Sequence, residues 1–81
     1  MVAAVDFSII RRRALENIRH DLMVAWSGTY PAAQVSTTFE AVLRLHNARA
    51  TVPDFIPILV EAEMLHLLRS DQLLDDSDRL N

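Results

Sequence analysis

The sequence predicts an all-α protein, an antiparallel three-helix bundle that forms a homodimer. One glycine occurs in 81 residues, and 51% of the residues are hydrophobic against 23% that are charged, a balance typical of a folded globular chain. Apolar side chains recur with the period of an amphipathic helix in three segments of about 16 to 22 residues. The connections between these segments are short, which favours antiparallel neighbours.

The first predicted helix is amphipathic on one side. Arg11 lies inside its apolar stripe, where the stem of the side chain can pack while the guanidinium reaches water. Gly28 follows the helix, and we expect it to end the helix in the left-handed conformation. The stripe consists of Phe7, Ile10, Ala14, Leu15, Ile18, Leu22, Ala25 and Trp26.

The second predicted helix runs from about Pro31 to about Arg49, with Pro31 at its first position, where a missing N–H costs nothing. His46 lies in the apolar stripe of this helix. We expect a core histidine that bonds a backbone carbonyl, with a metal ligand or general base as the alternative, because the three histidines show no zinc-binding spacing. The stripe consists of Val35, Phe39, Val42, Leu43 and His46.

The third predicted helix begins after Pro53. We expect Asp54 to be its N-cap and to accept a hydrogen bond from the Ile56 N–H, since Pro57 then lies in the first turn and needs no N–H. The acidic residues that follow oppose the dipole of a helix C-terminus, so the helix should fray between residues 70 and 74. The predicted domain is residues 1–74, followed by an acidic, disordered tail at 75–81.

The third helix is apolar on two faces. A bundle of 81 residues cannot surround one helix, so the surplus face should meet another chain, and an isologous homodimer is the simplest arrangement. The alternative is that both faces are core. One face consists of Phe55, Ile58, Leu59, Ala62 and Leu65. The other consists of Ile56, Val60, Met64, Leu67 and Leu68.

The segments SGTYPAAQV and ARATVPDFIPILVEAEMLHLL resemble a small actinobacterial family, a three-helix-bundle dimerisation domain. It occurs alone or N-terminal to low-molecular-weight tyrosine-phosphatase or arsenate-reductase-like proteins. The resemblance covers about residues 10–70 and is clearest at the pattern DFIPILVE, from Asp54 to Glu61. It implies that Ile56, Val60, Met64 and Leu68 form the core. Phe55, Ile58, Leu59, Ala62 and Leu65 are then left for dimerisation.

The composition favours a protein that binds rather than catalyses. The chain has no cysteine, so it cannot supply the thiolate that phosphatases and arsenate reductases of this type need. We expect no catalytic residue, cofactor or metal. The expected partners are a second copy and, from the resemblance, a phosphatase or arsenate-reductase-like protein. His66 lies close to the predicted dimer face and could make the dimer sensitive to pH.

The competing hypothesis is a small regulatory protein, antitoxin-like or a transcription accessory, that contacts nucleic acid. It depends on Arg11, Arg12 and Arg13, the one basic cluster. The net charge of −3 argues against it, and a solvated helix face is the simpler interpretation. An enzyme built across the dimer interface is a third hypothesis. No run approaches the roughly 20 apolar residues of a membrane span, and we expect a cytoplasmic protein.

Overall fold

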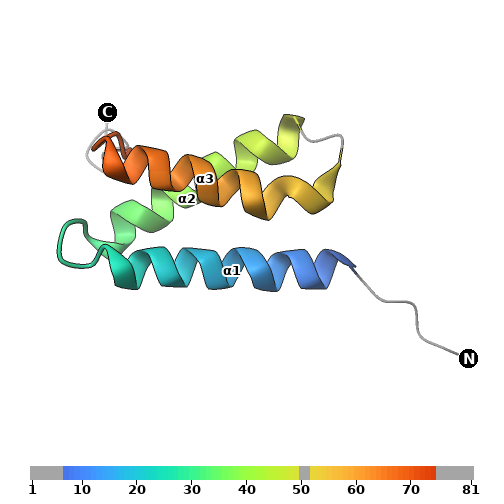
Figure 1. Cartoon of the computed structure of the whole chain (residues 1–81), viewed down its shortest axis with the longest axis horizontal. Coiled ribbons are helices and arrows are strands. Elements are labelled where there is room, and N and C mark those ends of the chain that lie inside the picture. Colours follow the sequence, from blue (N-terminus) through green and yellow to red (C-terminus); the bar gives the residue numbers. More distant parts are fainter. Residues whose placement is uncertain (1–6, 50–51, 75–81) are drawn as a thin grey trace, which may run out of the picture.

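Three helices pack against one another in the computed structural model, which describes residues 7–49 and 52–74. They are α1 (Phe7–Ala25), α2 (Ala32–Arg49) and α3 (Ile56–Arg69), and a short 3₁₀ helix, η1 (Pro53–Phe55), leads into α3. No strand occurs in these residues, so the prediction of an all-helical three-helix bundle is confirmed. The α1–α2 loop and the end of α3 lie at one end of the bundle, and the start of α1 lies with η1 at the other (Figure 1).

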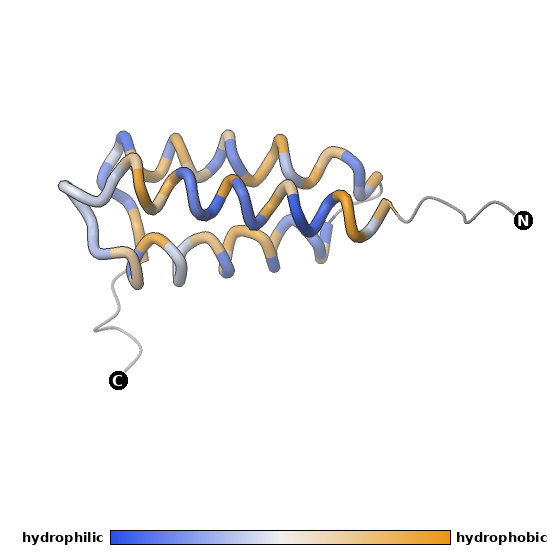
Figure 2. The backbone as a smooth tube through the Cα atoms, turned by 90° about the horizontal axis from the view of Figure 1, so that it is seen from below, coloured by the Kyte–Doolittle hydropathy of each residue, from blue (hydrophilic) through white to orange (hydrophobic). Residues whose placement is uncertain are grey.

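The core is formed mainly by α2 and α3. Among the buried apolar side chains, only Leu22 comes from α1, so α1 covers the other two helices more shallowly than they cover each other. The tube of α1 carries long hydrophilic stretches, whereas hydrophobic residues recur along α3 (Figure 2). The buried apolar residues are Leu22, Val35, Phe39, Val42, Ile56, Val60, Met64 and Leu68. The core of α3 is thus the set that the family resemblance implies.

The loop between α1 and α2 differs from the prediction at its glycine. Gly28 does not have a positive φ, so the predicted left-handed cap at this position is wrong. The chain turns instead through hydrogen bonds from the Thr29 and Tyr30 N–H groups to the Trp26 carbonyl, each 2.9 Å long. Pro31 immediately precedes α2, and its carbonyl accepts the first hydrogen bonds of that helix.

The start of α3 also differs from the prediction. Asp54 lies in η1 rather than at the N-cap of α3, and no side chain caps either helix. The Asp54 carboxylate accepts a hydrogen bond from Arg11 Nη1 of α1 instead, at 3.1 Å. The predicted cap is wrong because a partner from another helix competes for the same carboxylate, which local sequence does not show. Pro57 lies in the first turn of α3, as predicted.

The end of α3 is closed by a Schellman motif. Asp71 has a φ of 56°, and the Gln72 N–H donates to the Leu67 carbonyl at 2.9 Å while the Asp71 N–H donates to the Leu68 carbonyl at 3.4 Å. An aspartate therefore takes the left-handed position that glycine usually fills. Asp and Asn tolerate this conformation better than other side chains with a Cβ.

The segment after α3 is tied to the rest of the bundle. The Tyr30 hydroxyl donates to Asp71 Oδ1 at 2.6 Å, and the Leu74 N–H donates to Oγ1 of the buried Thr38 at 3.0 Å. The helix itself ends at Arg69, next to the predicted range of 70–74, and these bonds hold the non-helical segment that follows. The predicted acidic tail, 75–81, lies outside the described residues.

Candidate functional site

The predicted dimer face is largely exposed to solvent. We call Phe55, Ile58, Leu59, Ala62 and Leu65 the Phe55 face. Phe55 is 57% exposed, Ile58 66% and Leu59 47%. Ala62 is exposed as well, whereas Leu65 is half-buried and packs against the core. The alternative in which both faces of α3 are core is therefore wrong, and four of the five predicted residues present apolar surface to solvent.

A second exposed apolar area lies at the start of α1. Phe7 is 62% exposed and Ile10 is 53% exposed, although the sequence placed both in the core stripe of the first helix. That placement is wrong for the first turns of α1, whereas Leu15, Ile18 and Trp26 farther along the stripe do pack against the core. The periodicity shows which side of a helix is apolar, but it does not show how far the neighbouring helices extend to cover that side.

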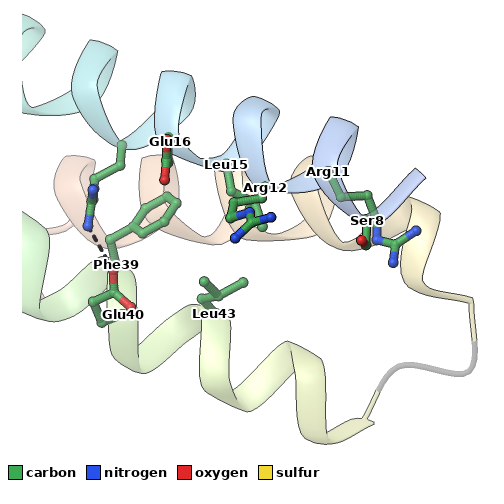
Figure 3. Close-up of a pocket in the computed structure, with 9 residues that line it drawn as sticks. Ser8, Arg11, Arg12, Leu15, Glu16, Phe39, Glu40 and Leu43 are labelled. Atoms are coloured by element: carbon green, nitrogen blue, oxygen red, sulfur yellow. Dashed lines mark hydrogen bonds and ion pairs between the residues drawn. The ribbon is translucent and has the colours of Figure 1, made fainter. Parts of the chain in front are cut away.

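The basic cluster is divided among different surroundings. Arg11 and Arg12 both line a groove of about 300 Å³ between α1 and α2, and Arg11 also bonds Asp54. Arg13 is exposed and does not line that groove. Figure 3 shows the groove, with Leu15, Phe39 and Leu43 between its polar side chains. Arg11 and Arg12 thus share one surface, and Arg13 lies outside it, so the cluster does not act as a set of three on a single phosphate backbone.

An ion pair and a histidine–carboxylate hydrogen bond link α2 to its two neighbours. Arg19 of α1 donates to Glu40 of α2 across the end of the groove, at 2.9 Å. On the other side, Nε2 of His46 lies 2.7 Å from Oε1 of Glu63 in α3, and both side chains are half-buried. The expectation that His46 bonds a backbone carbonyl is therefore wrong, because a carboxylate from the adjacent helix holds it. His66 is exposed on α3.

The described part of the chain holds neither a cluster of metal-binding side chains nor a helix that could span a membrane. In residues 7–49 and 52–74, no group of three or more metal-binding side chains could hold a metal ion. None of the helices described is long and apolar enough to cross a membrane. The main features that remain are the groove and the exposed apolar residues of α1, η1 and α3.

No family model, no curated protein and no solved structure matches this chain. The function therefore has to be argued from the surfaces described above.

Sequence reasoning found the Phe55 face but missed two features of the site. The exposure of Phe7 and Ile10 depends on where α3 begins relative to α1, which is a tertiary property. The groove depends on how α1 and α2 diverge, and the charged residues around it are spread between positions 11 and 40. The pairing of Arg19 with Glu40 could have been suggested by their positions on the outward sides of two adjacent amphipathic helices.

Proposed function

We propose that this protein is a non-enzymatic dimerisation or adaptor module of the cytoplasm, an antiparallel three-helix bundle that pairs with a second copy through the Phe55 face. The observation that carries the proposal is the exposure of Phe55, Ile58 and Leu59 on the side of α3 opposite its core. Large apolar side chains gathered on one surface mark interaction sites in soluble proteins.

The energetics favour a partner of the same kind. Burying the exposed fractions of Phe55, Ile58 and Leu59 from two protomers is worth about 5–10 kcal/mol, from transfer values of about 1.5–3 kcal/mol per full side chain. Association costs about 4–15 kcal/mol in lost rigid-body freedom. The two ranges overlap, so the Phe55 face alone lies at the margin of what a stable dimer needs. A two-fold interface uses the same face twice and needs no second protein.

The resemblance to the three-helix-bundle dimerisation domain supports the same proposal. In that family the domain accompanies tyrosine-phosphatase or arsenate-reductase-like proteins, so a protein of that kind is the proposed second partner of the module. The absence of cysteine supports a role beside such an enzyme rather than as one.

The test is sedimentation of the purified protein across a concentration series. We expect a monomer–dimer equilibrium in the wild type and a monomer in Leu59→Asp, because the new carboxylate would be buried without a partner in the interface. Val24→Asp is the matched control, since Val24 is an exposed apolar residue near the other end of α1. It should leave the equilibrium unchanged. A wild type that stays monomeric at every concentration refutes the proposal.

A further inference from the structure

We propose that Phe7 and Ile10 of α1 belong to the same docking surface as the Phe55 face, and that a second copy of this chain covers both. This inference rests on the proposed function and assigns α1 a part in the dimer interface. We call Phe7 and Ile10 the α1 apolar pair. Both are more than half exposed, although they lie in a helix whose later turns pack against the core.

The ion pair between Arg11 and Asp54 brings the α1 apolar pair close to the Phe55 face. Its atoms are 3.1 Å apart, so the second turn of α1 lies beside η1. Phe7 is one helical turn before Arg11, and Phe55 directly follows Asp54. Figure 1 shows the start of α1 and the start of α3 at the same end of the bundle. The exposed aromatic residues of the two elements therefore lie at the same end of the bundle.

The helical register places Ile10 on the side of α1 that faces away from α2, and Phe7 between Ile10 and the groove toward α2. At about 100° per residue, Phe7 and Ile10 lie roughly 140° and 160° from Arg12 around the helix axis. Arg12 lines the groove toward α2 together with Ser8 and Arg11. Ile10 therefore points away from that groove, and Phe7 lies beside its edge, about 40° from Arg11. Arg11, which reaches Asp54, lies between Phe7 and Arg12 in this register. The pair therefore borders the α3 side of the molecule.

The area needed for a stable dimer favours a surface that includes α1. A standard interface buries about 800 Å² per partner, of which roughly 60% is apolar, so each protomer should contribute about 480 Å² of apolar surface. From the exposed fractions of Phe55, Ile58 and Leu59 and typical side-chain areas, the Phe55 face offers about 230 Å². Adding the α1 apolar pair raises this to about 400 Å². The combined surface thus offers most of the apolar area that a standard interface needs, whereas the Phe55 face alone offers about half of that area.

A second copy is the occupant that the charges also allow. The surface between the two apolar areas is crossed by Arg11 and Asp54, which neutralise each other within one protomer. A second copy can therefore approach this surface without placing an unpaired charge of this pair in the interface. Unpaired charges at an interface centre would oppose association.

The test compares adjacent residues of α1 that share size and chemistry. Ile10→Glu places a charge in the proposed surface. Ile9→Glu is the control, because Ile9 is 40% exposed on the opposite side of α1, about 160° from Arg11. In sedimentation equilibrium, we expect Ile10→Glu to raise the dimer Kd at least about tenfold and Ile9→Glu to change it less than about threefold. Phe7→Ala, which removes apolar area without adding charge, should also raise the Kd. Circular dichroism checks that each variant keeps its helical content.

The outcomes separate this inference from the proposed function. If Leu59→Asp dissociates the dimer while Ile10→Glu and Phe7→Ala behave like the Ile9→Glu control, the interface excludes α1 and this inference is overturned alone. If the wild type shows no dimer, both the proposed function and this inference are overturned. Dissociation by Ile10→Glu and weakening by Phe7→Ala, with the control unchanged, support both.

Discussion

Truncating one side chain on each face of α3 should affect stability very differently. Met64 is fully buried, and replacing it with alanine removes core contacts and leaves a cavity, so Met64→Ala should lower the free energy of unfolding by about 2–5 kcal/mol. A domain of this size has a total stability of about 4–12 kcal/mol. Leu59 is 47% exposed, so Leu59→Ala gives up about half of a transfer value and leaves no cavity, a loss of no more than about 1 kcal/mol.

The assay is urea unfolding followed by circular dichroism, at one dilute and one concentrated protein sample. Met64→Ala should lose the same free energy at both concentrations, because its contacts lie within one protomer. The loss for Leu59→Ala should grow with protein concentration, because dimerisation stabilises the wild type by mass action. Thermal unfolding should show a fall in Tm of at least about 8 °C for Met64→Ala. A dilute Leu59→Ala sample that loses as much stability as Met64→Ala would refute the division of α3 into a core face and a docking face.

Two further predictions concern the end of the bundle where α3 finishes. The hydrogen bond from Tyr30 to the Asp71 carboxylate, followed by burial, raises the pKa of Tyr30 above 10.0. The neutral phenol is thus favoured in the folded state. Its contribution to the free energy of unfolding is complete below pH 10 and is lost as the pH rises through the raised pKa. The difference in the free energy of unfolding between wild type and Tyr30→Phe should therefore shrink above pH 10. Ultraviolet absorbance can follow the ionisation of the single tyrosine. The chain has no lysine, so no lysine titrates in the same pH range. Thr38→Val keeps the shape of a buried side chain but removes the acceptor for the Leu74 N–H, so it should lower the free energy of unfolding by about 1 kcal/mol, measured by urea unfolding. An unchanged value would mean that water replaces this bond at no cost.

The helices and the core face of α3 could be predicted because they depend on local periodicity. Val60 and Met64 recur at intervals of four residues in an almost continuously apolar segment, so a helix with a buried line follows from spacing alone. Choosing which of the two apolar faces is buried needed the family resemblance. Phe55 and Leu59 are as hydrophobic as the residues of the core, and composition cannot separate the two sets.

The features that the sequence did not predict involve partners far along the chain. Asp54 is a good N-cap by local rules, yet it pairs with Arg11, 43 residues away. His46 was expected to bond a carbonyl, yet a carboxylate 17 residues away holds it. In each case a polar side chain had several possible partners of similar energy, and the packing angle between helices decided which one was near.

The left-handed conformation was assigned to the wrong residue for a related reason. Gly28 is the one glycine, and glycine adopts positive φ without steric cost, so local rules favoured it. Asp71 adopts positive φ instead, where the Schellman bonds and the hydroxyl of Tyr30 compensate for the strain. Tyr30 belongs to the loop between α1 and α2, and the conformational propensity of Asp71 alone does not include a contact with that loop.

The two ends of the bundle are held by different numbers of hydrogen bonds, and this difference affects local opening. At the end where α3 finishes, a Schellman motif, the Tyr30–Asp71 bond and the Leu74–Thr38 bond tie three parts of the chain together. At the other end, the side-chain bond between α1 and η1 is the exposed Arg11–Asp54 pair, and exposed pairs contribute about 0–1 kcal/mol. The first turns of α1 should therefore open locally at a smaller cost in free energy than the core turns of α2 and α3, and their amides should exchange with solvent deuterium earlier. A second protomer that covers Phe7 and Ile10 would slow this exchange, because association would raise the free energy of local opening at that end of the bundle.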